Sequence, residues 1–143
     1  MIYLTYDHGG FDKREIVCDF LKKQKLKFID LGAKEFEALD DFPDFANPAC
    51  VEILKDIKKN VGIFMCGSGV GMCIAANRFK GINAAVCHTA DLAKLAREHN
   101  NINVLCVPSR FLSKEQIIEI INTFLTTKFL AGKYARRMEK VNC

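Results

Sequence analysis

The chain has no tryptophan, only three prolines and no pair of cysteines in a C-x-x-C spacing. Its seven cysteines are an odd number scattered over 143 residues, which fits neither a disulfide framework nor a structural zinc site. No apolar run approaches the about 20 residues that a membrane-spanning helix needs, and the short apolar start lacks the basic residues of a signal peptide. We therefore expect a reduced, cytoplasmic protein without a membrane partner.

What is present indicates one globular domain spanning residues 1–143. Half of the residues are hydrophobic, and the length suffices for a sizeable core. The net charge of +4 is mild; it suits a small anionic ligand, whereas the basic residues lack the interleaved aromatics of a nucleic-acid surface. Four cysteines in apolar surroundings are expected to be small buried side chains: Cys18, Cys73, Cys87 and Cys106.

Short apolar runs alternate with amphipathic stretches along the whole chain. The runs predict strands at 2–6, 27–31, 61–65, 82–87 and 103–107. Helices are expected from Asp12, with Glu15 in the capping-box position, then at 49–58, 72–79 and 89–98, after a Ser113–Gln116 capping box, and at 131–141. Pro43 and Pro48 predict a loop over 33–48. The fold class is α/β: a single-domain, Rossmann-like three-layer sandwich with a five-stranded, mostly parallel sheet and a C-terminal helix.

Chemically useful side chains follow the predicted strands. Asp7 and His8 follow the first, Cys66 the third and His88 the fourth, so all fall at the carboxyl edge of the sheet, where ligands bind in such folds. Backbone N–H groups after Cys66 would favour a thiolate, which can act as a base or nucleophile. The alternatives are a further buried cysteine and, for Asp7, a turn residue.

Three glycines follow this cysteine: Gly67, Gly69 and Gly71. Their G-x-G-x-G spacing is a weak dinucleotide signal and follows the third strand rather than the first. The glycines are better explained as allowing backbone amides to approach an anionic oxygen, of a phosphate or of a developing enolate.

His99 ends a helix that runs back across the sheet, so we expect it at the edge opposite Cys66. Either His99 is structural, or a second copy of the chain supplies it to a composite site. Lys133 and Arg137 are four residues apart on the last helix. They could clamp one phosphate, the alternative being an ordinary solvated basic helix.

Several ordered segments together resemble the ribose-5-phosphate isomerase B family, which includes sugar-phosphate isomerases of the galactose 6-phosphate type. The resemblance covers nearly the whole chain. It rests on residues 7–11 (DHGGF), 41–46 (DFPDFA), 66–72 (CGSGVGM), 74–77 (IAAN), 97–100 (REHN), 103–105 (NVL) and 109–110 (SR).

The resemblance implies interconversion of ribose 5-phosphate and ribulose 5-phosphate without metal or organic cofactor. It implies that Cys66 moves a proton between C1 and C2 through a cis-enediolate, and that His99 assists ring opening. Asp7 would act at the ring hydroxyls, and Ser68 with the loop amides would hold the enediolate oxygens. It also implies a homodimer with composite sites, alone or paired into a tetramer. The remaining substrate-binding residues would be His8, Asn100, Arg110, Lys133 and Arg137.

Three positions depart from the pattern of the family. Phe42 stands where a tyrosine is frequent, Lys133 replaces an arginine, and Tyr134 stands where a histidine is frequent. These changes bear on phosphate affinity and sugar choice. Two alternative functions stay open: an isomerase of six-carbon sugar phosphates, of the allose or galactose 6-phosphate type, and a non-catalytic sugar-phosphate-binding protein.

Overall fold

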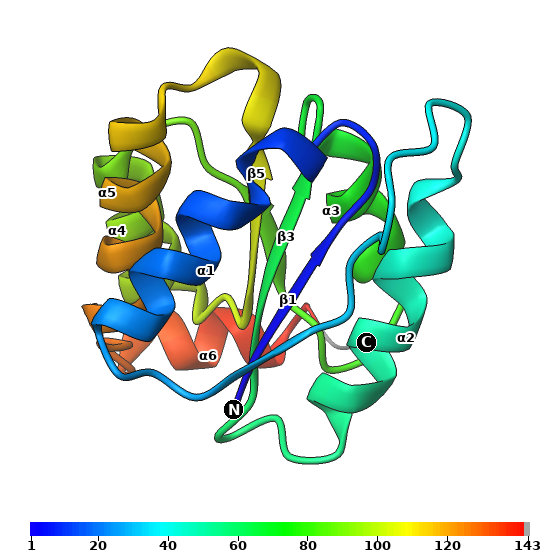
Figure 1. The fold of residues 1–143 in the computed structure, drawn as a ribbon. Helices are drawn as coiled ribbons and strands as arrows, with labels where there is room; N and C mark the ends of the chain where they lie inside the picture. Colours follow the sequence, from blue (N-terminus) through cyan, green and yellow to red (C-terminus); the bar gives the residue numbers. More distant parts are fainter. Residues whose placement is uncertain (142–143) are drawn as a thin grey trace.

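The computed structural model describes residues 1–141 and contains one sheet in the order β2-β1-β3-β5-β4. Every strand pairing in the described residues is parallel, so the predicted sheet is confirmed (Figure 1). The strands are β1 (Ile2–Tyr6), β2 (Phe28–Asp30), β3 (Val61–Cys66), β4 (Ala84–Val86) and β5 (Val104–Pro108).

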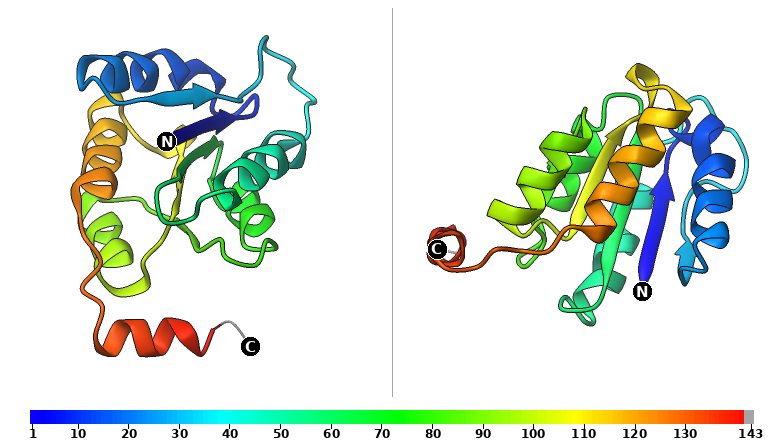
Figure 2. Two further views of the ribbon diagram at one scale, coloured as in Figure 1. Left: turned by 90° about the horizontal axis from the view of Figure 1, so that it is seen from below. Right: turned by 90° about the vertical axis from the view of Figure 1, so that its left-hand side faces the viewer.

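Helices cover both faces of this sheet, giving the three predicted layers (Figure 2). One core packs beneath α1 (Arg14–Lys23), α4 (Ala90–Asn100) and α5 (Lys114–Thr126). A second core packs beneath α2 (Phe42–Leu54) and α3 (Val70–Ala76). Because both faces are covered, β1 and β5 are buried along their whole length, which explains their continuous apolar sequences. Short 3-10 helices, η1 (Phe11–Lys13) and η2 (Ser109–Phe111), follow β1 and β5.

The order in which the chain adds strands to the sheet reverses direction between the neighbouring strands β1 and β3. From β1 the chain goes through α1 to β2 on one side, whereas from β3 it goes through α3 toward β4 on the other side and the other face. The carboxyl ends of these two neighbouring strands therefore border a crevice, because their outgoing connections separate there. Asp7, His8 and Cys66 lie at this point.

The loop predicted over 33–48 is wrong in its second half, because α2 begins at Phe42. Pro43 lies in the first helical turn, where the missing N–H would have no partner anyway. Pro48 lies inside the helix, where it removes one backbone hydrogen bond. Packing outweighs this loss, since α2 buries a complete face against the sheet: Ala46, Ala49, Cys50 and Ile53.

The two predicted capping boxes have opposite outcomes. Ser113 and Gln116 form theirs, with Ser113 Oγ accepting from the Gln116 N–H at 3.2 Å and Gln116 Oε1 accepting from the Ser113 N–H at 2.9 Å. The box expected from Asp12 and Glu15 is absent, since the described cap residues of η1 and α1 make no side-chain cap bond. Asp12 lies inside η1 and pairs with Lys13 at 3.4 Å.

The six cysteines within residues 1–141 are free thiols, and Cys143 lies outside the described residues. Cys87 and Cys106 are buried as predicted, whereas Cys18 and Cys73 are only partly buried. Burial raises the pKa of Cys87 to about 11, while a hydrogen bond with Cys106 lowers the pKa of Cys73 to about 7. None of the described helices is long and apolar enough to cross a membrane.

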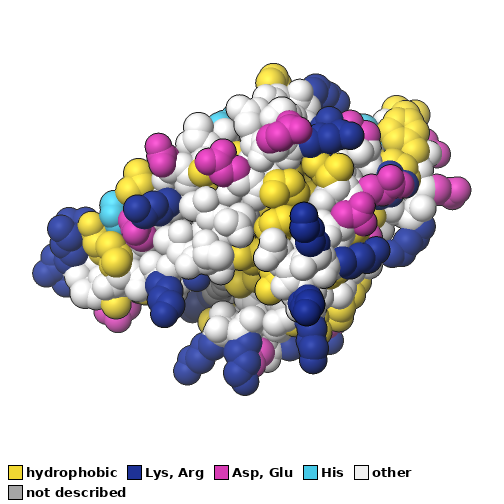
Figure 3. Space-filling view, turned by 60° about the vertical axis from the view of Figure 1, so that its left-hand side comes forward, with side chains coloured by type: hydrophobic (Ala, Val, Ile, Leu, Met, Phe, Trp, Pro, Cys, Tyr) yellow, Lys and Arg dark blue, Asp and Glu magenta, His cyan; other side chains and the backbone are white. Residues whose placement is uncertain are grey.

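The last helix, α6 (Lys133–Glu139), stands apart from the three layers (Figure 2). It buries none of its residues and contacts the body of the protein at the end of α4. Lys and Arg side chains gather at this projecting end of the molecule (Figure 3); those of α6 are Lys133, Arg136 and Arg137. Because most of the stability of a helix in a protein comes from packing one face, α6 gains little stability from its own chain.

Candidate active site

The turn after β1 lies directly against the loop after β3. A Cβ atom on Gly9 would come within 2.4 Å of the Gly67 backbone nitrogen, so no other residue fits there without moving the chain. Asp7, His8 and Cys66 are thereby held at one edge of the sheet, as the sequence predicted. The close approach also explains why the turn needs its glycine.

Cys66 is the last residue of β3, and its residue surface is only 5% exposed. Its sulfur accepts a hydrogen bond from the Gly69 N–H at 3.1 Å. Gly69 has a φ of +76°, in the left-handed region that favours glycine. A backbone donor pointing at the sulfur stabilises negative charge on it, so the geometry suits a thiolate.

The loop after Cys66 is packed tightly by protein neighbours. A Cβ atom on Gly67 would lie 3.1 Å from the guanidinium carbon of Arg110, and one on Gly71 would lie 3.0 Å from the Phe42 ring. The backbone N–H of Arg110 also donates to the backbone carbonyl of Gly67 at 3.0 Å. Ser68 is exposed, and its hydroxyl accepts from the Val70 N–H at 3.3 Å. The glycines therefore bring Arg110 close to the loop while leaving Ser68 open to a ligand.

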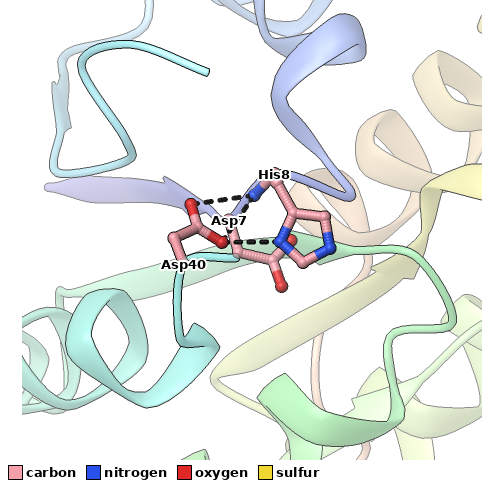
Figure 4. Close-up of side chains that lie close together, drawn as sticks. All are labelled: Asp7, His8 and Asp40. Carbon is pink, nitrogen blue, oxygen red and sulfur yellow. Dashed lines mark hydrogen bonds and ion pairs between the residues drawn. The ribbon is translucent and has the colours of Figure 1, made fainter. Parts of the chain in front are cut away.

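Asp7, His8 and Asp40 form a compact set at the end of β1 (Figure 4). Nδ1 of His8 lies 2.6 Å from Oδ1 of Asp40, and the His8 backbone N–H donates to both Asp40 oxygens at 3.1 Å. Oδ1 of Asp7 accepts from the Gly9 N–H at 2.8 Å. Burial raises the pKa of Asp7, and the hydrogen bond to Asp40 is the largest cause that raises the pKa of His8.

Among the residues that the structure describes, these three side chains also form a cluster that could hold a metal ion, because their ligand atoms lie within 4.8 Å of one another. The His8–Asp40 contact of 2.6 Å is, however, a hydrogen-bond length that places a proton between the two atoms. The backbone donors occupy further oxygen positions. Hydrogen bonds therefore already engage these ligand atoms, those of Asp40 with His8 and that of Asp7 with the Gly9 N–H.

A hollow of about 370 Å³ opens beside His8 and is lined by His8, Gly9, Asp12, Lys13, Phe36, Ser109 and Arg110. Three of these residues can carry positive charge, against one carboxylate, Asp12, which pairs with Lys13. The Ser109 hydroxyl is buried and has no hydrogen-bond partner among the residues the structure describes, although a buried polar atom normally has one. A larger hollow of about 540 Å³ lies between α1 and α5, away from Cys66 and His8.

The opposite edge of the sheet carries a separate group of residues. The His99 ring stacks on the Tyr134 ring at 4.2 Å between centroids and an angle of 11°, and the Asn100 amide donates to the Met138 sulfur at 3.6 Å. Lys133 and Arg137 both lie over the Tyr134 ring, at 5.2 and 5.7 Å. The structure thus divides the predicted site residues between two edges, as expected from the direction of α4.

Other predicted or motif residues lie elsewhere or have structural contacts. His88 is exposed and lines a different hollow, with Thr89 and Gln116. Asn77 joins the end of α3 to β4, accepting from the Ala84 N–H and donating to the Ala84 carbonyl, each at 2.9 Å. The segments that carry the family resemblance therefore include residues that hold the fold.

Sequence reasoning missed Asp40, Lys13 and the role of Ser109 in the hollow. Asp40 belongs to an aspartate doublet that ends two residues before Pro43, and aspartate is common at helix starts. Its contact with His8 spans 32 residues, and such a long-range pairing leaves no periodic signal in the sequence.

The strand order reverses between β1 and β3, and a thiol and a cationic hollow lie at this point. This arrangement defines a small-ligand site of the doubly wound α/β class. The family model described as Ribose/Galactose Isomerase matches residues 2–141. The chain is 41% identical to the probable ribose-5-phosphate isomerase B of Mycoplasma genitalium, over 98% of this chain and 92% of the relative. The chain belongs to the ribose/galactose isomerase family, and its resemblance to it is confirmed.

Solved and curated relatives agree with this assignment. The structure of ribose-5-phosphate isomerase B from Mycoplasma genitalium with bound ribulose-5-phosphate matches with a TM-score of 0.95, covering 98% of this chain and 92% of that one at 41% identity. The D-erythrulose-4-phosphate isomerase of Pectobacterium atrosepticum is 34% identical over 98% of this chain and 91% of its own length. The chain is accordingly an enzyme of the aldose–ketose isomerase class.

Proposed function

We propose that this protein interconverts ribose 5-phosphate and ribulose 5-phosphate, and that the whole chain forms one isomerase domain. The observation that carries the proposal is the Cys66 sulfur, which accepts the Gly69 N–H at 3.1 Å beside an open serine, next to a cationic hollow. The matching structure of a relative with bound ribulose-5-phosphate supports the choice of substrate.

In the proposed reaction, the Cys66 thiolate removes the C2 proton of open-chain ribose 5-phosphate. The electron pair moves into the C1–C2 bond, and the C1 carbonyl becomes one oxygen of a cis-enediolate. The thiol returns the proton to C1, while the hydroxyl proton of O2 passes to O1, so that a ketone forms at C2. Ser68 and loop amides would hold the two oxygens; one such donor contributes about 3 kcal/mol in other enzymes.

The hollow beside His8 would receive the phosphate. His8 and Arg110 border it, and the Ser109 hydroxyl, which has no partner within residues 1–141, can donate a further hydrogen bond. Binding the phosphate away from the reacting carbons positions the open chain against Cys66. Asp7, whose pKa is raised by burial, lies on the same side for contact with the sugar hydroxyls.

We further propose a homodimer in which a second copy supplies His99 for ring opening, with Asn100, Lys133 and Arg137. Support comes from α6, which has no buried residue, and from exposed apolar pairs at helical spacing on α3 (Val70 and Ile74) and α4 (Leu92 and Leu95). Exposed apolar helix faces favour association with another surface. Paired dimers would form a tetramer.

The decisive experiment is an assay of the purified protein with ribose 5-phosphate, following formation of ribulose 5-phosphate. Allose 6-phosphate, galactose 6-phosphate and erythrulose 4-phosphate are compared in parallel. The expected result is the highest kcat/KM with the pentose. A hexose or tetrose preference would refute the proposed substrate and keep the mechanism, whereas binding without turnover would refute both.

A further inference from the structure

The Asp40 side chain is largely buried, although the residues just before it in its loop, 34–39, are exposed. The loop joins β2 to α2, and its neighbouring side chains Phe36 and Leu39 are 60% and 87% exposed. The Asp40 side chain, in contrast, is only 9% exposed. It lies between the end of β1 and the start of α2, turned toward His8 (Figure 4). Burying a carboxylate is costly unless it is paired and hydrogen-bonded, so its partners are informative.

Within residues 1–141, every side-chain hydrogen bond of Asp40 is made with one residue, His8. Its oxygens accept from the backbone N–H of His8 at 3.1 Å and meet Nδ1 of the same residue at 2.6 Å. A carboxylate only accepts, so the contact with Nδ1 requires the proton to be on Nδ1. The ring is thereby fixed in one orientation, with Nε2 directed away from Asp40 (Figure 4).

The charges around His8 favour its protonated form. The hydrogen bond to Asp40 raises its pKa most, and the charge of Asp7 raises it further, whereas partial burial and the charge of Arg110 oppose the rise. Lys13 and Asp12 complete the charged lining of the hollow. A protonated imidazole offers a charge-assisted donor at Nε2, the kind of group that binds phosphate strongly.

We propose that Asp40 is the positioning residue of His8: its buried carboxylate fixes the ring so that Nε2–H points at the anionic end of the substrate. The inference rests on the proposed function, because it assumes that His8 binds the phosphate. Asp40 itself acts through His8 and touches no reacting atom. In other proteins, carboxylates that hydrogen-bond to a ring nitrogen of a metal-binding histidine fix the orientation of that ring in the same way.

The first test measures the His8 ring itself, without substrate or activity. In ¹⁵N-labelled protein the chain has three histidines, and His8→Ala assigns the His8 signals. We expect the wild-type His8 to carry its neutral-state proton on Nδ1 and to titrate above an ordinary histidine. Asp40→Asn should lower its pKa and mix the tautomers. A neutral Nε2–H form in the wild type, or an unchanged titration in Asp40→Asn, overturns the proposal.

The second test is kinetic. Asp40→Asn should raise the KM for ribose 5-phosphate about tenfold, the effect of losing a charge-assisted bond, with a smaller change in kcat. Because His8 must be protonated to bind, kcat/KM is lost as pH rises through its pKa, and this loss should move to lower pH in Asp40→Asn. Glu35→Gln is the matched control, since it removes an exposed carboxylate from the same loop.

A double-mutant cycle separates positioning from a general role of Asp40 in the loop. In a His8→Ala background, Asp40→Asn should raise KM no further, because its effect passes through the missing ring. Additive losses would overturn the proposal. Failure of the proposed isomerase function gives a different result. If ribose 5-phosphate is not a substrate, no variant shows turnover, whereas the NMR titration still decides whether Asp40 controls the protonation of His8.

Discussion

The two edges of the sheet differ in how firmly they hold their functional side chains. At the carboxyl edge, Cys66 and His8 are fixed by hydrogen bonds from or to neighbouring loops, and the glycines let those loops touch. At the opposite edge, His99 is held by a stack on Tyr134, from a helix with no buried residue. One edge is organised by hydrogen bonds and close backbone packing, whereas the other rests on a ring stack with an exposed helix.

This difference suggests a division of labour. Proton transfer between two carbons needs a base and oxyanion donors fixed within fractions of an ångström, and the carboxyl edge provides a rigid frame for them. Ring opening needs a proton donor or acceptor that reaches a substrate already bound. In the proposed dimer, His99 at the end of α4 would supply that group to the site of the second chain.

Replacing the base should have the largest effect. Cys66→Ala is expected to lower kcat by about 10²–10⁴-fold, the usual contribution of a general base, with ribulose 5-phosphate still bound. Exchange of solvent deuterium into C1 of ribulose 5-phosphate measures this step alone, because it involves no ring chemistry. Retention of most of the exchange would remove Cys66 from the mechanism. Thermal unfolding checks that the small substitution preserves the fold.

His99→Ala should separate the two edges. Turnover of ribose 5-phosphate, which is mainly cyclic in water, is expected to fall about 10²-fold. Deuterium exchange into open-chain ribulose 5-phosphate should change far less. His88→Ala is the control, since His88 is exposed and lines a different hollow. Equal losses in both assays would argue against a ring-opening role.

Mixing the two inactive variants tests whether the edges belong to different chains. If Cys66→Ala and His99→Ala chains exchange freely at equal amounts, half of the dimers are mixed and each contains one intact site. About a quarter of the wild-type activity should then return, as the symmetry of a two-fold dimer requires. Mixed dimers are verified by native mass spectrometry. If they form and no activity returns, each site is built within one chain.

The sequence predicts the sheet well because buried parallel strands leave continuous apolar runs and glycines mark where the chain turns. It therefore places Cys66 and His8 at one edge and His99 at the other. The predicted start of α2 is wrong because the two prolines do not decide where the helix begins; the buried face of Ala46, Ala49 and Ile53 does. Asp40 could not be found, since nothing local links it to a histidine 32 residues away.

The smallest expected effect comes from Ser109, at the rim of the rigid edge. Ser109→Ala should raise the KM for ribose 5-phosphate about fivefold, the value of one ordinary hydrogen bond. It should leave stability unchanged or slightly higher, because the buried hydroxyl has no partner among the described residues. Ser113→Ala is the matched control: loss of its capping box should cost about 1 kcal/mol of stability and leave KM unchanged. A Ser109→Ala protein that loses stability at constant KM would show that its hydroxyl serves the fold, and the hollow would then lack one of its proposed phosphate donors.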